Sequence, residues 1–134
     1  GHSVGDAVLK RVAAIVRSQT RQDDLLVRAG GDEFVVVCPG LTDDLRLTSL
    51  AAGLIRAISE PAMIDGQDVT IGASIGIAVS RMVVRCDPAT HVSRADVALY
   101  AAKRSGRGRH LFWTSGMGDS LADLDLPAAQ SRGG

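Results

Sequence analysis

The chain begins with apolar residues at helical spacing. Leu9, Val12 and Val16 recur at intervals of three and four residues, so one stripe of a helix would face a core. Asp6 stands just before this stripe and is a good N-cap residue. The pattern therefore predicts a first helix over residues 6–19.

Two later segments carry the same period. Thr42 is followed by two acidic residues, a typical helix start, and predicts a second helix that runs to about residue 59. Ser93 precedes a run of alanine and valine at helical spacing. We expect Ser93 to cap a third helix that ends near Ser105 and Gly106.

Between the helices the apolar period changes to two. The segments LLV and FVVV flank a glycine-containing turn at residues 30–33 and predict a hairpin. A second hairpin is expected at the Asp65-Gly66 turn, then a long strand over residues 69–80 and an edge strand over 110–113. The predicted fold class is α/β: an α+β sandwich with helices packed on one mixed β-sheet.

Length and composition restrict the choice further. With 134 residues, 46% of them hydrophobic, the chain is long enough for one domain with a core. Fifteen basic residues balance fifteen acidic ones, so net charge does not indicate a nucleic-acid partner. No apolar run approaches the roughly 20 residues of a membrane helix, and Cys38 and Cys86 form no paired motif, which fits the cytoplasm. Residues 114–134 lose the apolar pattern and are expected to form a flexible tail.

The densest charge in the first hairpin falls at its turn. Gly30 and Gly31 permit positive φ and leave backbone N–H groups bare, whereas Asp32 and Glu33 beside them would repel an anion. A hard cation such as Mg²⁺, held between carboxylate and phosphate oxygens, would resolve this conflict. The same residues are common in ordinary solvated turns, and spacing alone favours that alternative.

A second charged cluster ends the third predicted helix. Lys103 and Arg107 stand four residues apart, so they share a face if the helix persists and could converge on one polyphosphate. Basic residues at a helix C-terminus also offset the helix dipole, and taken alone that explanation is favoured.

Several spaced motifs agree with one known family. In chain order they are GHSVGD, RQDDLLVRAGGDEF, ASIGIA and ADVALYAAKRSGRGR. Over residues 1–113 the chain closely resembles the GGDEF family of diguanylate cyclases, and four motifs in order are more specific than one pentapeptide. The resemblance implies a nucleotidyl-cyclase-like fold. It also implies that a homodimer condenses two GTP molecules to cyclic di-GMP and pyrophosphate.

The resemblance also implies roles for single residues. Asp32, with Glu33 beside it, would bind Mg²⁺ or Mn²⁺ and activate the 3′-hydroxyl that attacks the α-phosphate. The two glycines of the turn would let the phosphates lie against the backbone. Lys103 and Arg107 would hold the terminal phosphates. Asp6 would accept hydrogen bonds from guanine, a role that competes with capping the first helix.

An inhibitory site is implied upstream of the hairpin. Arg21 and Asp24 match the RxxD pattern, in which the pair would bind cyclic di-GMP and hold the domain in an unproductive arrangement. Arginine binds phosphate or a guanine edge, and aspartate accepts from guanine N–H groups. A charged loop without a ligand is the plainer alternative.

One part of the family pattern has no counterpart in this chain. The family's first strand carries a metal-binding aspartate, and the sequence starts at Gly1, about where that region should end. We therefore expect residues 1–113 to form a GGDEF domain that lacks its N-terminal part, inactive and aggregation-prone alone. The intact parent is expected to be active and to carry sensory or phosphodiesterase domains, and its membrane attachment through the missing regions stays open. Two alternatives remain: an idle receptor for GTP or cyclic di-GMP, and a scaffold domain.

Overall fold

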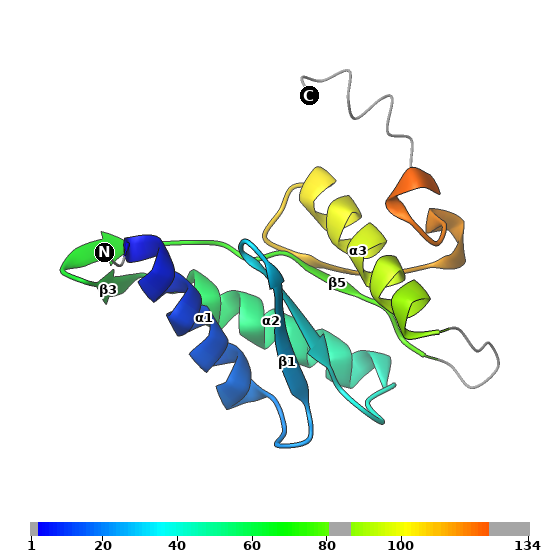
Figure 1. The fold of residues 1–134 in the computed structure, drawn as a ribbon, viewed down its shortest axis with the longest axis horizontal. Coiled ribbons are helices and arrows are strands. Elements are labelled where there is room, and N and C mark those ends of the chain that lie inside the picture. Colours follow the sequence, from blue (N-terminus) through cyan, green and yellow to red (C-terminus); the bar gives the residue numbers. More distant parts are fainter. Residues whose placement is uncertain (1–2, 81–86, 124–134) are drawn as a thin grey trace. The chain divides into compact units, whose positions relative to one another are not determined.

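The chain forms a mixed α/β fold that divides into two compact units after Gly72. The structure is a computed structural model that describes residues 3–80 and 87–123. Figure 1 shows the elements in chain order. Within the described ranges no helix is long and apolar enough to cross a membrane. The elements are α1 (Val4–Gln19), β1 (Leu25–Gly30), β2 (Glu33–Val37), α2 (Asp44–Ser59), β3 (Ala62–Ile64), β4 (Gln67–Val69), β5 (Ile75–Ile77), α3 (Pro88–Arg104) and β6 (His110–Phe112), followed by the 3₁₀ turns η1 (Ser115–Met117) and η2 (Leu121–Asp123).

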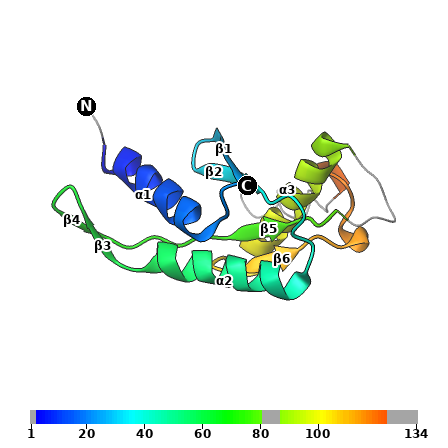
Figure 2. The ribbon, with the colours of Figure 1, turned by 90° about the horizontal axis from the view of Figure 1, so that it is seen from below.

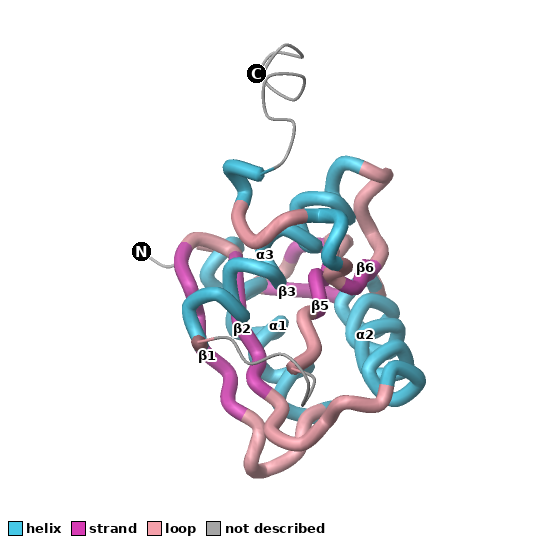
Figure 3. The backbone as a smooth tube through the Cα atoms, turned by 90° about the vertical axis from the view of Figure 1, so that its right-hand side faces the viewer, coloured by secondary structure: helices cyan, strands magenta, loops and turns pink. Residues whose placement is uncertain are grey.

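The strands pair two by two. Helices and short strand pairs are distinguished by colour in Figure 3. Among the residues that the structure describes, β1–β2 and β3–β4 are antiparallel pairs and β5–β6 is a parallel pair. The sequence predicted one mixed sheet instead. In the described residues each strand is hydrogen-bonded to a single partner strand, so the three pairs do not join into one sheet.

The first unit is built on the packing of α1 against α2. The helix α1 also contacts β1 and β3, and the β3–β4 hairpin lies next to the start of α1 (Figure 2). The core of this unit consists of apolar side chains, and their removal from water is the main contribution that stabilises such a small unit. The buried side chains are Val16, Leu47, Ala51, Leu54, Ile58 and Ile64.

In both helices of the first unit the N-cap is a different residue from the predicted one. Ser3, and not Asp6, is the N-cap of α1, because the Ser3 hydroxyl oxygen accepts a hydrogen bond from the Asp6 N–H at 3.2 Å. Asp43, and not Thr42, caps α2 by accepting from the Leu45 N–H at 2.9 Å. In both places more than one nearby residue is a good cap, and local preference alone does not select between them.

The two predicted hairpins are confirmed. The β3–β4 turn places Asp65 at φ 50° and Gly66 at φ 81°, the positive φ values that a two-residue hairpin turn requires.

The second unit packs α3 against β5 and β6, and Val97, Ala98 and Ala102 have no exposed surface.

The strand β5 lies very close to α3. A Cβ atom at Gly76 would overlap the backbone of Ala95 and Leu99, so only glycine allows this approach. The long strand predicted over residues 69–80 is wrong in extent. Residues 70–74 and 78–80 are not strand, and β5 pairs with β6 over only three residues.

The helix α3 begins earlier than predicted. Asp87 is its N-cap and accepts a hydrogen bond from the Thr90 N–H at 2.8 Å, with Pro88 as the first helical residue. Proline suits this position because its missing N–H would have had no partner in the helix. Ser93 therefore lies inside the helix, whereas the predicted end near Ser105 is confirmed.

The segment that follows β6 folds back on α3. The Trp113 indole Nε1–H donates to the Gly118 carbonyl at 2.6 Å, and the Ser93 hydroxyl donates to the Asp119 carbonyl at 2.7 Å. The Arg94 guanidinium stacks on Trp113 at 4.2 Å from the ring centre and pairs with the Asp119 carboxylate at 2.9 Å. The flexible tail expected from residue 114 thus starts with ordered turns, and residues 124–134 lie outside the described part.

Candidate functional site

The charged turn joins β1 to β2. Gly30 pairs with Glu33 across the hairpin, so Gly31 and Asp32 form the two-residue tip, with a bulge after Arg28. Gly30 has φ 144° and Gly31 has φ 51°, and a Cβ added at either would meet no atom within 4 Å. Backbone conformation, and not crowding by the described protein atoms, therefore requires these glycines.

The hairpin tip is braced by a side chain from its own strand. The Arg28 guanidinium donates from Nε at 2.9 Å and from Nη2 at 2.5 Å to the carbonyl oxygen of Gly31. The brace ties the first residue of the two-residue tip to β1. Sequence analysis missed Arg28, although a long donor three residues before a glycine turn is the signal that could have revealed it.

Asp32 and Glu33 both lie on the exposed surface of the hairpin. Within residues 3–80 and 87–123, no group of three or more histidine, cysteine, aspartate or glutamate side chains could hold a metal ion. Mg²⁺ is commonly held by only one or two carboxylates, with substrate phosphates and water as its other ligands. The two adjacent carboxylates fit a cation of that kind and do not form a closed protein cage.

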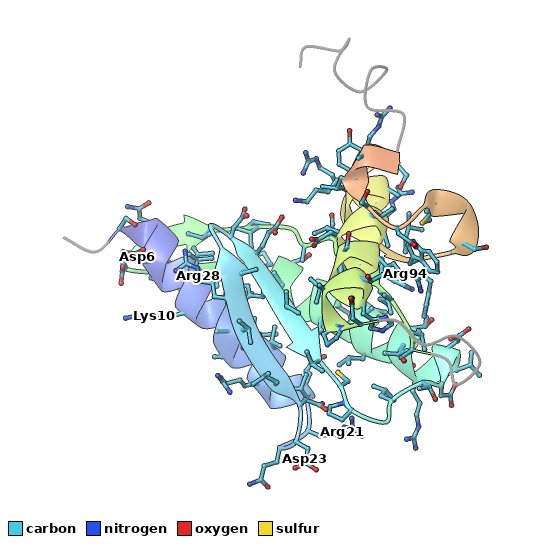
Figure 4. The ribbon with its side chains drawn as sticks, turned by 45° about the vertical axis from the view of Figure 1, so that its right-hand side comes forward. Asp6, Lys10, Arg21, Asp23, Arg28 and Arg94 are labelled. Carbon is cyan, nitrogen blue, oxygen red and sulfur yellow. The ribbon has the colours of Figure 1, made fainter. Side chains whose placement is uncertain are left out.

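Asp6 lies in the first turn of α1 and is exposed. Figure 4 shows Asp6 and Arg28 toward one end of the first unit and Arg21 toward the other end. Ser3 is the N-cap residue, and the negative charge of Asp6 in the first turn is favourable at the positive end of the helix dipole.

Arg21 and Asp24 are bonded to each other. Arg21 donates to Asp24 from its backbone N at 2.7 Å and from Nη2 at 2.9 Å, and Nη2 also donates to the Pro39 carbonyl at 2.8 Å. The Asp24 side chain is 2% exposed, against 52% for Arg21. These bonds hold the turn before β1 against the end of β2.

The surroundings of Asp24 shift the pKa values of Asp24 and of the nearby Cys38. Hydrogen bonding from the Arg21 side chain holds the pKa of the Asp24 carboxyl below its usual value. Burial, reinforced by the negative charge of Asp24, raises the pKa of the Cys38 thiol above its usual value. Asp24 is therefore ionised and well supplied with donors.

Lys103 and Arg107 lie in the second unit. Lys103 is in the last turn of α3 and the helix ends at Arg104, so the condition for a helical face shared with Arg107, that the helix persists to that residue, is not met. Arg107 follows the helix at φ 59°, and its N–H donates to the Ala102 carbonyl at 3.0 Å, a bond typical of a Schellman helix end. Its exposed side chain is carried by a turn and not by the helix.

Comparison with known families places the chain directly. The family model for the diguanylate cyclase GGDEF domain matches residues 1–109, and the chain belongs to this family. The chain is 38% identical over 109 residues to diguanylate cyclase TpbB of Pseudomonas aeruginosa, covering 81% of this chain and 25% of TpbB. It is also 38% identical over 120 residues to MucR of that species, a bifunctional diguanylate cyclase and cyclic di-GMP phosphodiesterase, covering 87% of this chain and 17% of MucR.

Solved structures agree on the fold. The crystallised GGDEF domain of TpbB superposes with a TM-score of 0.77 at 33% identity, over 98% of this chain and 71% of that one. The GGDEF domain of DgcB from Caulobacter crescentus, solved in complex with cyclic di-GMP, superposes with a TM-score of 0.74 at 27% identity, over 84% and 66% of the two chains. The mixed α/β arrangement described above is thus a GGDEF-like fold. The chain spans only a quarter or less of the two curated relatives named here.

Proposed function

We propose that this chain provides the catalytic hairpin of a diguanylate cyclase, which condenses two GTP molecules to cyclic di-GMP and two pyrophosphates. One observation carries the proposal: a tip with two positive-φ glycines next to two exposed carboxylates, in a member of the GGDEF family. Bare backbone N–H groups and flanking acids suit a triphosphate that arrives with a divalent cation.

The reaction would occur between two subunits, each holding one GTP. The 3′-hydroxyl of each nucleotide forms a bond to the α-phosphorus of the other, and each α-phosphorus loses pyrophosphate. Asp32 would accept the proton of the attacking hydroxyl, with Glu33 beside it. Both carboxylates would hold Mg²⁺ or Mn²⁺, which would neutralise phosphate charge. Gly30 and Gly31 would let the phosphates approach the backbone.

Three further residues would contact the substrate. Asp6 is exposed in the first turn of α1, and its carboxylate would accept hydrogen bonds from guanine N–H groups. Lys103 at the end of α3 and Arg107 in the following turn would bind the terminal phosphates. The turn geometry means that Arg107 is positioned by the helix end, and not by helical spacing from Lys103.

Product inhibition would use the turn that contains Arg21 and Asp24. Their mutual ion pair keeps the Arg21 guanidinium in a fixed place with about half of its side chain exposed. A fixed and partly exposed guanidinium is suited to a phosphate of cyclic di-GMP.

Residues 1–113 would form the GGDEF domain. MucR shows that a relative combines cyclase and phosphodiesterase activities, and a parent with sensory or phosphodiesterase domains would fit that pattern. An idle receptor for GTP or cyclic di-GMP is the alternative, because the Arg21–Asp24 turn serves product binding in either case.

A chimera tests the proposal. The part of the TpbB GGDEF domain that aligns with this chain would be replaced by residues 1–109, in otherwise complete TpbB. With GTP and Mg²⁺ we expect the chimera to form cyclic di-GMP. A folded chimera that binds GTP but forms no cyclic di-GMP would favour the receptor alternative.

A further inference from the structure

The turn between α1 and β1 borders a groove that sequence analysis did not anticipate. The groove has a volume of about 360 Å³ and is lined by Arg17, Thr20, Arg21, Gln22, Asp24 and Leu26. This volume falls within the range of about 300 to 1,000 Å³ that is usual for small-molecule sites. All six residues belong to the first unit, so the groove does not depend on the placement of the second.

Two arginines enter this groove from different local structures. Arg17 lies in the last turn of α1, and Arg21 follows the helix end at Gln19. The end of the helix is fixed by the Thr20 hydroxyl, which donates to the Val16 carbonyl at 2.8 Å. The chain therefore turns at a defined point and places Arg21 and Arg17 on the same groove.

The two arginines differ in their partners. Arg21 is paired with Asp24, whose two carboxylate oxygens both accept hydrogen bonds from it. Within the described parts of the chain no ion pair of Arg17 is present, and its side chain is exposed. The one carboxylate in the lining is thus already bonded, and Arg17 leaves the groove with an excess positive charge.

Asp24 is poorly placed to contact a ligand. Its side chain is 2% exposed, and its oxygens are bonded to Arg21. A buried and fully engaged carboxylate can orient its arginine but leaves little surface for a guanine edge. This contrasts with the role that the RxxD resemblance implies for Asp24.

We propose that Arg17 is a third residue of the product site and contacts a phosphate of cyclic di-GMP together with Arg21, while Asp24 positions Arg21. The inference rests on the proposed function, because it names the residues that hold the product. Cyclic di-GMP carries two phosphates, and two arginines on one groove match them in charge. The lower part of Figure 4 shows where Arg21 projects from the turn.

Arg17 also stands at the C-terminal end of α1, where a cation is favourable without any ligand. The test must therefore measure binding and not stability. Arg17→Met keeps a long apolar stem and removes the charge. Arg46→Met is a matched control, since Arg46 is an exposed arginine of α2 in the same unit and does not line the groove.

Binding of cyclic di-GMP to the full 134-residue chain would be measured by calorimetry at several salt concentrations. We expect Arg17→Met to weaken binding about tenfold, as for the loss of one charge-assisted hydrogen bond, and to reduce the salt dependence of Kd. Arg46→Met should bind as the unaltered chain does. Arg17→Lys should recover part of the affinity, because it restores the charge but not the planar fork.

The possible results distinguish the role of Arg17 from product binding and from cyclase activity. Equal affinity and equal salt dependence for Arg17→Met and the unaltered chain would overturn the inference and leave product binding intact. No binding of cyclic di-GMP by the unaltered chain would overturn product inhibition and the inference with it. An inactive chimera with normal Arg17-dependent binding would refute the cyclase proposal alone.

Discussion

Arg28 donates two hydrogen bonds to a single atom, the carbonyl oxygen of Gly31, and so fixes the residue that precedes Asp32. The donor atoms are Nε and Nη2 of one planar guanidinium, so the contact restricts orientation as well as distance. The tip is therefore held in place by β1 before any ligand arrives.

This brace predicts that Arg28 affects turnover more than binding at the distant groove. In the chimera with TpbB, Arg28→Lys should lower the rate of cyclic di-GMP formation roughly ten- to a hundredfold, because small displacements of reacting groups cost about that much. Lysine keeps the charge but lacks the planar fork. Rates would be compared with Arg46→Lys, which should match the unaltered chimera. An unchanged rate for Arg28→Lys would show that the brace is dispensable.

The close approach of β5 to α3 predicts a large effect of one methyl group. Gly76→Ala should destabilise the second unit by about 1 to 3 kcal/mol or more, because the new Cβ would overlap the backbone of Ala95 and Leu99. Gly72→Ala is the control, since a Cβ there would meet no atom within 4 Å. Thermal unfolding would measure both. Similar melting temperatures for the two variants would contradict the packing described.

The Arg21–Asp24 pair predicts a pH dependence of stability. The folded pKa of Asp24 lies below the ordinary value of about 3.9, so the pair stabilises the fold above that pH. This contribution is lost as the pH falls through the lowered pKa of Asp24. Asp24→Asn should thus reduce the free energy of unfolding at pH 7, and its difference from the unaltered chain should shrink at acidic pH.

Urea unfolding at a series of pH values would follow this difference. Asp23→Asn changes the exposed neighbouring carboxylate and should alter stability less than Asp24→Asn at pH 7. A deficit of Asp24→Asn that stays constant from pH 7 to well below pH 4 would contradict the ion pair.

The contact between Arg94 and Trp113 predicts a spectroscopic change. Trp113 is the single tryptophan of the chain, so its fluorescence reports the segment that folds back on α3. Arg94→Met should shift the emission to longer wavelength and lower stability by about 0.5 to 1 kcal/mol. Arg104→Met, whose guanidinium lies over Tyr100 instead, should leave the emission in place. The same emission for both variants would show that the Arg94 contact is absent in solution.

Local patterns in the sequence were sufficient for much of the fold. The apolar period of α2, the Asp65-Gly66 turn and the glycine pair at the hairpin tip each determine structure within a few residues. Helix starts were less well determined. The stretch before α2 offers two adjacent capping residues, and the local sequence does not distinguish Thr42 from Asp43.

Features that depend on distant residues were missed. The bonds from Trp113 to Gly118 and from Arg94 to Asp119 join a polar segment to a helix, and no periodicity marks such contacts. Arg17 likewise becomes part of a groove only because the chain turns after Thr20. Tertiary structure, and not local preference, creates both.

Asp32 at the hairpin tip is the proposed general base of the reaction. The most direct measurement is cyclic di-GMP formation from GTP and Mg²⁺ by the chimera and by its Asp32→Asn variant, with cyclic di-GMP binding as the check on folding. We expect the rate to fall by about a hundredfold or more, as for the loss of a general base, while cyclic di-GMP binding persists. An Asp32→Asn chimera that forms cyclic di-GMP at the unaltered rate would contradict the account.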